Sequence, residues 1–119
     1  KKAPLPVGPY SQAIMVNNTL YISGQVALNP ENNELIEGSV EKESYQIMEN
    51  IKSILNESGL SFKNVVRSKI YLTDMNNFSK VNQVYGSYFE KGQEPARTTI
   101  EVSGLPLGVG VEIDMIAVV

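Results

Sequence analysis

The sequence contains neither cysteine nor histidine. Without cysteine, the chain has no disulfides, no thiolate nucleophile and no zinc-thiolate site. Without histidine, it has no Ser-His-Asp triad, no paired-histidine ribonuclease site and no HExxH metal helix. Proton transfer near pH 7 therefore falls to Glu, Asp, Tyr or Lys with a shifted pKa, or to a positioned water molecule.

Positive charge is also scarce, with 10 Lys and Arg against 13 Asp and Glu and a formal net charge of −3. Binding to nucleic acid depends on Lys and Arg at the phosphates, so RNA or DNA is not an expected partner. No apolar stretch approaches the ~20 residues that span a bilayer, and no hydrophobic signal core follows Lys1 and Lys2. We expect a cytoplasmic protein with no membrane partner.

The 119 residues are 42% hydrophobic and 19% charged, which fits one domain over residues 1–119. Residues 12–16 and 19–24 are expected to form a hairpin, because Asn17 and Asn18 tolerate positive φ. Helical spacing follows Ser39, which suits an N-cap, and stops at Gly59. No glycine pattern precedes a helix as a phosphate-binding loop would, so no nucleotide cofactor is expected.

The second half of the chain continues as strand, helix and two strands. Alternation over residues 65–73 places Val66, Ser68, Ile70 and Leu72 on one face. A helix follows residues 74–77 and is expected to end near Gly92. Its apolar stripe consists of Phe78, Val81, Tyr85, Tyr88 and Phe89. Residues 97–102 and 109–118 are expected to be strands that form a second pair.

The predicted order is β-β-α-β-α-β-β, which indicates a two-layer α+β domain with two helices on one face of a mixed sheet. The other sheet face would carry either the aliphatic residues of 109–118 or the alternate set with Glu112 and Asp114. A small domain hardly leaves so much strand surface in water, so we expect other copies of the chain to cover it in a closed ring.

Two charged residues stand in apolar strands. Arg97 follows Pro95 and is either a surface or ion-paired arginine, or a planar fork that binds a carboxylate bidentately. Glu112 has aliphatic neighbours on both sides and is either a sheet-surface residue beside Asp114, or a desolvated proton acceptor with a raised pKa. Local sequence leaves both alternatives open. Since Arg97 begins one strand and Glu112 lies in the next, both are expected to face a common cleft whose other wall belongs to another subunit.

Four further residues have a structural and a functional interpretation. Tyr10 follows a proline turn and Ser23 ends a strand, and both hydroxyls could bind a ligand. Gly24 permits either a bulge or the close approach of a bare N–H to a ligand. Asn82 is either an amide at the edge of the core or a ligand contact.

These pieces resemble the reactive intermediate/imine deaminase family (RidA; YjgF/YER057c/UK114) over nearly the whole chain. The segments that carry the resemblance are Gly8-Pro9-Tyr10-Ser11-Gln12, Ser23-Gly24-Gln25, Glu49-Asn50-Ile51, Tyr71-Leu72-Thr73-Asp74-Met75, Val81-Asn82-Gln83-Val84-Tyr85, Pro95-Ala96-Arg97 and Val111-Glu112-Ile113. The spacing from Pro95 to Ile113 is more specific than any single motif.

The resemblance implies a chorismate-mutase-like fold of the bacillus type, assembled as a homotrimer with ligand clefts between neighbouring subunits. It implies hydrolysis of 2-aminoacrylate, 2-aminocrotonate or their imine tautomers to 2-keto acids and ammonia, with no cofactor and no metal. The same family name also covers endoribonucleases that inhibit translation, and relatives that bind small carboxylates without catalysis.

Carried over to this sequence, Arg97 would bind the substrate carboxylate and Glu112 would orient and activate water. Tyr10, Ser23 and Asn82 would shape the cleft, and Gly24 would add a main-chain donor. Thr99 stands where relatives often have cysteine, and we expect its backbone to matter more than its side chain.

Overall fold

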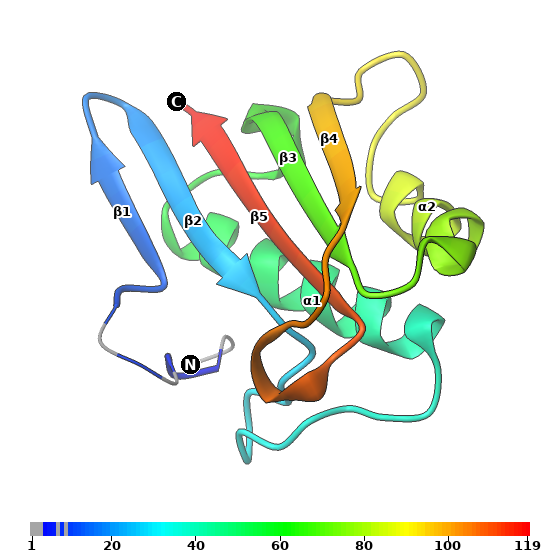
Figure 1. The fold of residues 1–119 in the computed structure, drawn as a ribbon. Helices are drawn as coiled ribbons and strands as arrows, with labels where there is room; N and C mark the ends of the chain where they lie inside the picture. Colours follow the sequence, from blue (N-terminus) through cyan, green and yellow to red (C-terminus); the bar gives the residue numbers. More distant parts are fainter. Residues whose placement is uncertain (1–3, 7, 9) are drawn as a thin grey trace.

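The computed structural model describes residues 4–6, 8 and 10–119, and there the predicted order of elements is confirmed (Figure 1). The helices and strands are β1 (Ala13–Val16), β2 (Thr19–Gln25), α1 (Val40–Glu57), β3 (Val65–Leu72), α2 (Phe78–Gly86), β4 (Ala96–Glu101) and β5 (Val111–Val118). Of the helices in these residues, none is both long and apolar enough to cross a lipid bilayer.

The five described strands form one mixed sheet in the order β1-β2-β5-β3-β4. β3 and β4 are parallel, and the other neighbouring strands are antiparallel. The prediction that residues 97–102 and 109–118 pair with each other is wrong, because β3 lies between β4 and β5. The reason is the crossover through α2, which returns β4 parallel to β3 on its outer edge and leaves the other edge of β3 to β5.

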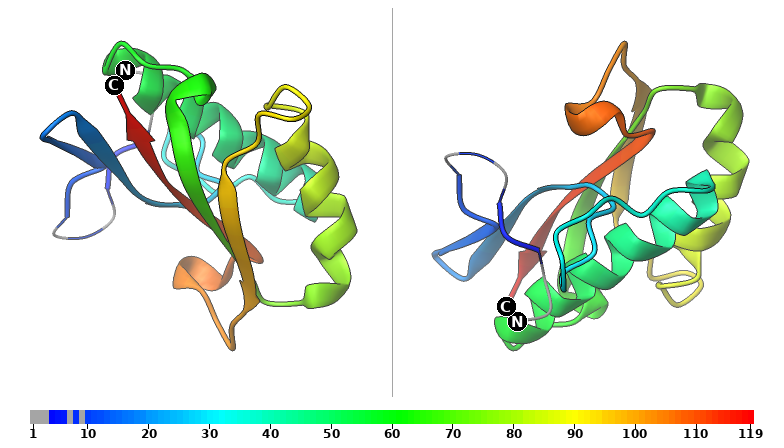
Figure 2. Two further views of the ribbon diagram at one scale, coloured as in Figure 1. Left: turned by 90° about the horizontal axis from the view of Figure 1, so that it is seen from above. Right: turned by 90° about the horizontal axis from the view of Figure 1, so that it is seen from below.

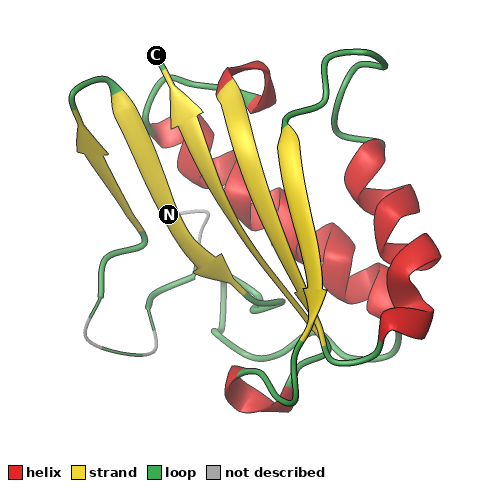
Figure 3. Ribbon diagram, turned by 45° about the horizontal axis from the view of Figure 1, so that its top comes forward, coloured by secondary structure: helices red, strands yellow, loops and turns green. Residues whose placement is uncertain are grey.

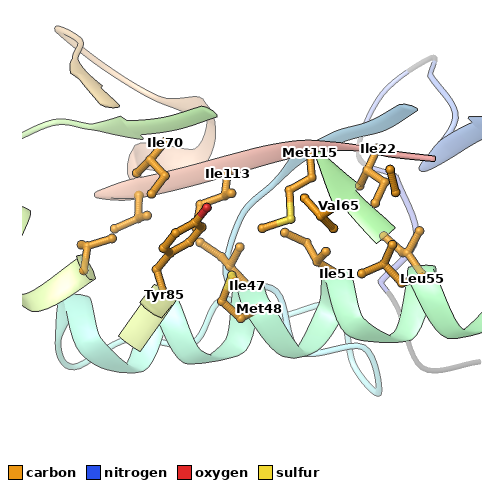
Figure 4. Packing of buried hydrophobic residues seen from close by; sticks show 14 of the residues in the cluster. Ile22, Ile47, Met48, Ile51, Leu55, Val65, Ile70, Tyr85, Ile113 and Met115 are labelled. Carbon is orange, nitrogen blue, oxygen red and sulfur yellow. The ribbon is translucent and has the colours of Figure 1, made fainter. Parts of the chain in front are cut away.

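Both helices lie on one side of the sheet, which confirms the two-layer α+β arrangement (Figures 2 and 3). The N-cap prediction for α1 is confirmed, since Ser39 Oγ accepts a hydrogen bond from the Lys42 N–H at 3.1 Å. Gly59 follows the helix with a φ of +75°, a conformation that glycine adopts without strain. The core between the layers joins α1 residues such as Ile47 and Ile51 to Ile113 of β5 (Figure 4).

The alternation of buried residues shows which way each strand faces. In β5 the aliphatic set of Val111, Ile113, Met115 and Ala117 is buried toward the helices. Glu112, Asp114 and Ile116 therefore point to the opposite side of the sheet, which we call the open face. The glutamate therefore belongs to the face opposite the two helices.

Two features differ from the sequence expectation, the direction of one side chain in β3 and the end of α2. A bulge between Val65 and Arg67 buries Val65 and leaves Val66 48% exposed, so the prediction that Val66 shares a face with Ser68, Ile70 and Leu72 is wrong. Helix α2 ends at Gly86 rather than near Gly92. Beyond it, the rings of Tyr88 and Phe89 pack against Phe62, with centroids 5.3 and 5.4 Å away. The apolar stripe thus continues in a turn rather than in the helix.

Candidate active site

Glu112 lies directly against the backbone of Gly24, across the β2–β5 pair. A Cβ at Gly24 would overlap Oε2 of Glu112 and come within 2.8 Å of its carboxyl carbon. Gly24 also sits where the register between β2 and β5 shifts, between Ile22 and Gln25. The bulge and the close approach are therefore one feature, and the absent side chain of Gly24 makes room for the carboxylate.

The environment of Glu112 favours its protonated form. Burial raises the pKa of this carboxyl, and the nearby carboxylate of Asp114 raises it further. Asp114 is held by the hydroxyl of Tyr71, which donates a hydrogen bond to Oδ2 at 2.9 Å. A carboxylate with a raised pKa is a better proton acceptor near neutral pH than an ordinary glutamate.

A cleft with a volume of about 450 Å³ opens beside this carboxylate. We call it the Glu112 cleft, and its lining residues are Tyr10, Ser23, Gly24, Val26, Pro106 and Glu112. The structure thus places four of the predicted site residues around one cleft. The Ser23 hydroxyl donates to the carbonyl of Ser11 at 2.6 Å, which fixes its orientation.

Two glutamines attach the segment with Tyr10 to the end of β2. Gln25 is only 3% exposed, and its amide donates to Oε1 of Gln12 at 2.8 Å. The amide of Gln12 in turn donates to the carbonyl of Pro4. Sequence reasoning assigns neither glutamine a role, and the available signal is that each one closes a motif of the family resemblance. The pair positions one wall of the Glu112 cleft.

Arg97 lies on the other side of the sheet. Its neighbour Thr98 accepts a hydrogen bond from Arg67 on the open face, so Arg97 points toward the helices. There Nη1 of Arg97 donates to Oδ1 of Asn82 at 2.6 Å. Its Cζ lies 5.6 Å from the ring centroid of Phe78 and 5.2 Å from that of Tyr85. The contact of Asn82 within this chain is therefore with the arginine.

The surroundings of Arg97 argue against a structural ion pair. Among the residues that the structure describes, none forms a salt bridge with Arg97. The side chain is nevertheless half-buried between β4 and α2. A partly desolvated cation without a carboxylate partner is well placed to bind a carboxylate from a ligand.

Thr99 faces the same side as Arg97, and its hydroxyl is buried. Among the described residues, the hydroxyls of Thr99, Ser68 and Tyr85 are buried without a hydrogen-bond partner. Ser68 lies opposite Arg97 in the β3–β4 ladder. Burial raises the pKa of Tyr85, while the charge of Arg97 acts in the opposite direction. Arg97 thus lies beside a layer of buried hydroxyls.

The seven predicted site residues therefore fall into two groups in one chain. Tyr10, Ser23, Gly24 and Glu112 form one half-site at the Glu112 cleft. Arg97, Asn82 and Thr99 form the other, which we call the Arg97 half-site. The expectation that Arg97 and Glu112 face a common cleft is wrong for a single chain. β3 separates their strands, and the two side chains leave the sheet on opposite faces.

The residues described by the structure contain no group of three or more Asp, Glu, His or Cys side chains that could hold a metal ion. The chemical groups that the two half-sites offer are a carboxylate with a raised pKa and a guanidinium, together with backbone and hydroxyl groups. Such a set suits a small anionic substrate that reacts with water.

Comparison with known proteins supports the resemblance seen in the sequence. The family model described as Endoribonuclease L-PSP matches residues 1–119. The 2-iminobutanoate/2-iminopropanoate deaminase of Mus musculus is 48% identical over 117 residues, which cover 98% of this chain and 86% of that protein.

Solved structures agree in fold. RidA from the Antarctic bacterium Psychrobacter superposes with a TM-score of 0.94 at 42% identity, covering 99% of this chain and 94% of that one. TdcF from E. coli, solved with bound serine, gives a TM-score of 0.92 at 32% identity with the same coverage of each chain. The chain therefore belongs to the RidA (YjgF/YER057c/UK114) family, whose members include imine deaminases.

Proposed function

We propose that this protein is a hydrolytic deaminase that converts reactive 2-imino acids, or their enamine tautomers, to 2-keto acids and ammonia. The observation that carries the proposal is the pairing of chemical properties in the two half-sites. Arg97 is a half-buried cation without a carboxylate partner, and Glu112 is a carboxyl whose pKa burial raises. The 48% identity to the mouse deaminase supports the same reaction.

The substrate class requires the two half-sites to come from different chains. A 2-imino acid has its carboxylate bonded directly to the imine carbon, so one site must reach both groups at once. Because Arg97 and Glu112 lie on opposite faces of one sheet, the Arg97 half-site of one copy would meet the Glu112 cleft of the next.

An interface between two different surfaces of the same chain is heterologous, and such interfaces form a ring when the rotation between neighbouring copies closes. The open face supplies an apolar surface for it, where Ile14, Val16 and Tyr21 are each about half exposed. The proposed assembly is the homotrimer that the family resemblance implies, with one cleft at each of its interfaces.

In the proposed reaction, the Arg97 guanidinium binds the substrate carboxylate and leaves the imine carbon near Glu112. Water attacks that carbon while Glu112 accepts its proton, and the C=N double bond becomes a C–N single bond. That proton then passes to the nitrogen, which gives a carbinolamine with one hydroxyl and one amino group. Transfer of the hydroxyl proton to the amino nitrogen accompanies cleavage of the C–N bond, so the keto group forms and ammonia leaves.

No metal or covalent nucleophile is required for this reaction, because an imine is already electrophilic. Orientation of substrate and water supplies part of the rate enhancement. General-base catalysis by Glu112 contributes about 10²–10⁴-fold more. The Gly24 N–H is available as a main-chain donor in the same cleft.

The test is to add the purified protein to a threonine dehydratase reaction and to follow the release of 2-oxobutanoate. We expect the wild-type protein to accelerate the release and Arg97→Ala to abolish the acceleration. Lys80→Ala is the matched control, because Lys80 is an exposed cation of the neighbouring helix α2. Equal rates with and without the wild-type protein would refute the deaminase assignment.

The description of the family model favours one alternative, a single-strand endoribonuclease. The net charge of −3 and the absence of histidine weigh against it. RNA cleavage that persists through stringent purification and disappears in Glu112→Gln would support this alternative. Binding of 2-oxobutanoate without any acceleration of its release would instead indicate a small-carboxylate-binding regulator.

A further inference from the structure

The contacts of Arg97 come from one face of helix α2. Phe78, Asn82 and Tyr85 are spaced by four and three residues, so they follow one another along a single helical face. The two aromatic rings lie within cation–π distance of the guanidinium, and the Asn82 amide accepts from Nη1. One helix thus supplies three contacts to a single side chain of β4.

The chemistry of these contacts differs from that of a salt bridge. A carboxylate partner would occupy the N–H donors of Arg97 and would compete with any anionic ligand. An aromatic face attracts the cation through the ring and leaves those donors available. Arg97 is therefore held in place while most of its hydrogen-bonding capacity remains for the ligand.

The two rings are held differently. Tyr85 is 4% exposed, and its hydroxyl points from α2 toward the sheet (Figure 4). It also packs against Phe89, with ring centroids 5.0 Å apart. Phe78 is 36% exposed and lies at the first turn of α2. A substitution at Phe78 therefore disturbs the core much less than one at Tyr85.

We propose that Phe78 and Tyr85 are positioning residues, whose rings hold the Arg97 guanidinium in the orientation that binds the substrate carboxylate. This proposal rests on the proposed function, which identifies the bound carboxylate as that of a 2-imino acid. It assigns a role to two residues whose side chains have no functional assignment from the sequence pattern.

The experiment compares Phe78→Leu, Tyr85→Leu and Tyr85→Phe with the wild-type protein. Phe62→Leu is the control, because Phe62 belongs to the adjoining aromatic cluster and its ring packs on Tyr88 and Phe89 rather than on Arg97. Calorimetry measures the dissociation constant for 2-oxobutanoate, and steady-state kinetics give KM and kcat for the imine. Side-chain NMR signals of Arg97 report the ring contacts without any ligand.

Phe78→Leu and Tyr85→Leu are each expected to raise the dissociation constant and KM about three- to tenfold, since each removes one cation–π contact. They should leave kcat within about twofold, because the general base is untouched. A mere folding defect would instead lower the active fraction and kcat at unchanged KM. Tyr85→Phe keeps the ring and should bind within about twofold of wild type. The aromatic rings should shift the NMR signals of the Arg97 side chain upfield. This upfield shift should become smaller only in the two leucine variants.

An unchanged dissociation constant in both leucine variants would overturn the proposal, as would an equal loss in Phe62→Leu. Failure of the wild-type protein to bind 2-oxobutanoate would overturn it as well. If the wild type binds 2-oxobutanoate but does not accelerate deamination, the proposed reaction fails, and the leucine variants still decide the positioning role through calorimetry.

Discussion

The two half-sites are built in different ways. At the Glu112 cleft the carboxylate rests against a bare backbone, and any side chain at Gly24 would occupy its place. At the Arg97 half-site, three side chains of one helix surround the functional group. Where a carboxylate packs directly on the backbone, the addition of a single carbon atom at that position should abolish activity. A site shaped by side chains loses affinity gradually, one contact at a time.

The largest expected effect tests whether the two half-sites come from different chains. Arg97→Ala and Glu112→Gln are each expected to be inactive alone. When the two variants are unfolded, mixed in equal amounts and refolded together, about one quarter of the ring interfaces pair an intact Arg97 with an intact Glu112. The assay is deaminase activity per chain. If mixing restores no activity, Arg97 and Glu112 act within one chain, and the division into two half-sites from different chains is wrong.

Gly24→Ala is expected to lower kcat about 100-fold or more, because its Cβ displaces the carboxylate of the general base. Gly86→Ala is the matched control, since a Cβ there meets no atom within 4 Å. It should keep full activity and raise the free energy of unfolding by about 0.5–1 kcal/mol, as alanine does in place of a helical glycine. Near-normal kcat in Gly24→Ala would show that Glu112 can move without loss.

Asn82 allows the same comparison at the Arg97 half-site. Asn82→Ala removes the 2.6 Å contact and should raise KM about tenfold. Asn82→Asp places a carboxylate against Arg97, so it should raise KM further by competing with the substrate. Steady-state kinetics at several substrate concentrations separate KM from kcat. A greater loss in the alanine variant than in the aspartate variant would contradict the competition.

The smallest expected effect concerns pH. Burial and Asp114 raise the pKa of Glu112, so activity should fall as pH drops through that raised value and the base becomes protonated. Asp114→Asn removes the second cause and keeps an acceptor for Tyr71. It should move the acidic limb of the kcat/KM profile to lower pH by less than about one unit. If the acidic limb does not move, burial alone raises the pKa of Glu112.

The raised pKa also links pH to stability. The folded state holds the Glu112 proton more tightly than the unfolded state, so this group's contribution to stability is lost as pH rises through the folded pKa. Glu112→Gln should therefore stabilise the protein more at pH 8 than at pH 4. Thermal unfolding at the two pH values measures the difference, with Glu57→Gln as the exposed control.

Local sequence was sufficient for the elements whose signals are local. Ser39 and Gly59 define the ends of α1 because capping depends on a few neighbouring residues. The bulge at Val66 has no such signal, since alternation looks regular through it. The pairing of β4 with β3 also depends on the crossover rather than on either strand's residues.

The face of the sheet to which each candidate site residue points was harder to predict. In β4, Arg97, Thr98 and Thr99 offer no contrast between polar and apolar positions, so the direction of Arg97 follows only from its register with β3. In β5 both parities contain aliphatic residues, and burial against α1 decides between them. The motif spacing pointed to Arg97 and Glu112 as candidates but could not show that they leave the sheet on opposite faces.

The placement of Arg97 and Glu112 on opposite faces has a consequence for enzyme concentration. If the proposed assembly is right, an isolated chain contains one half of each of two reaction centres and no complete centre, so a newly made chain should be catalytically inert. Specific activity should then decline on dilution, following the dissociation of the ring. The cell would obtain activity only once enough copies have accumulated to assemble.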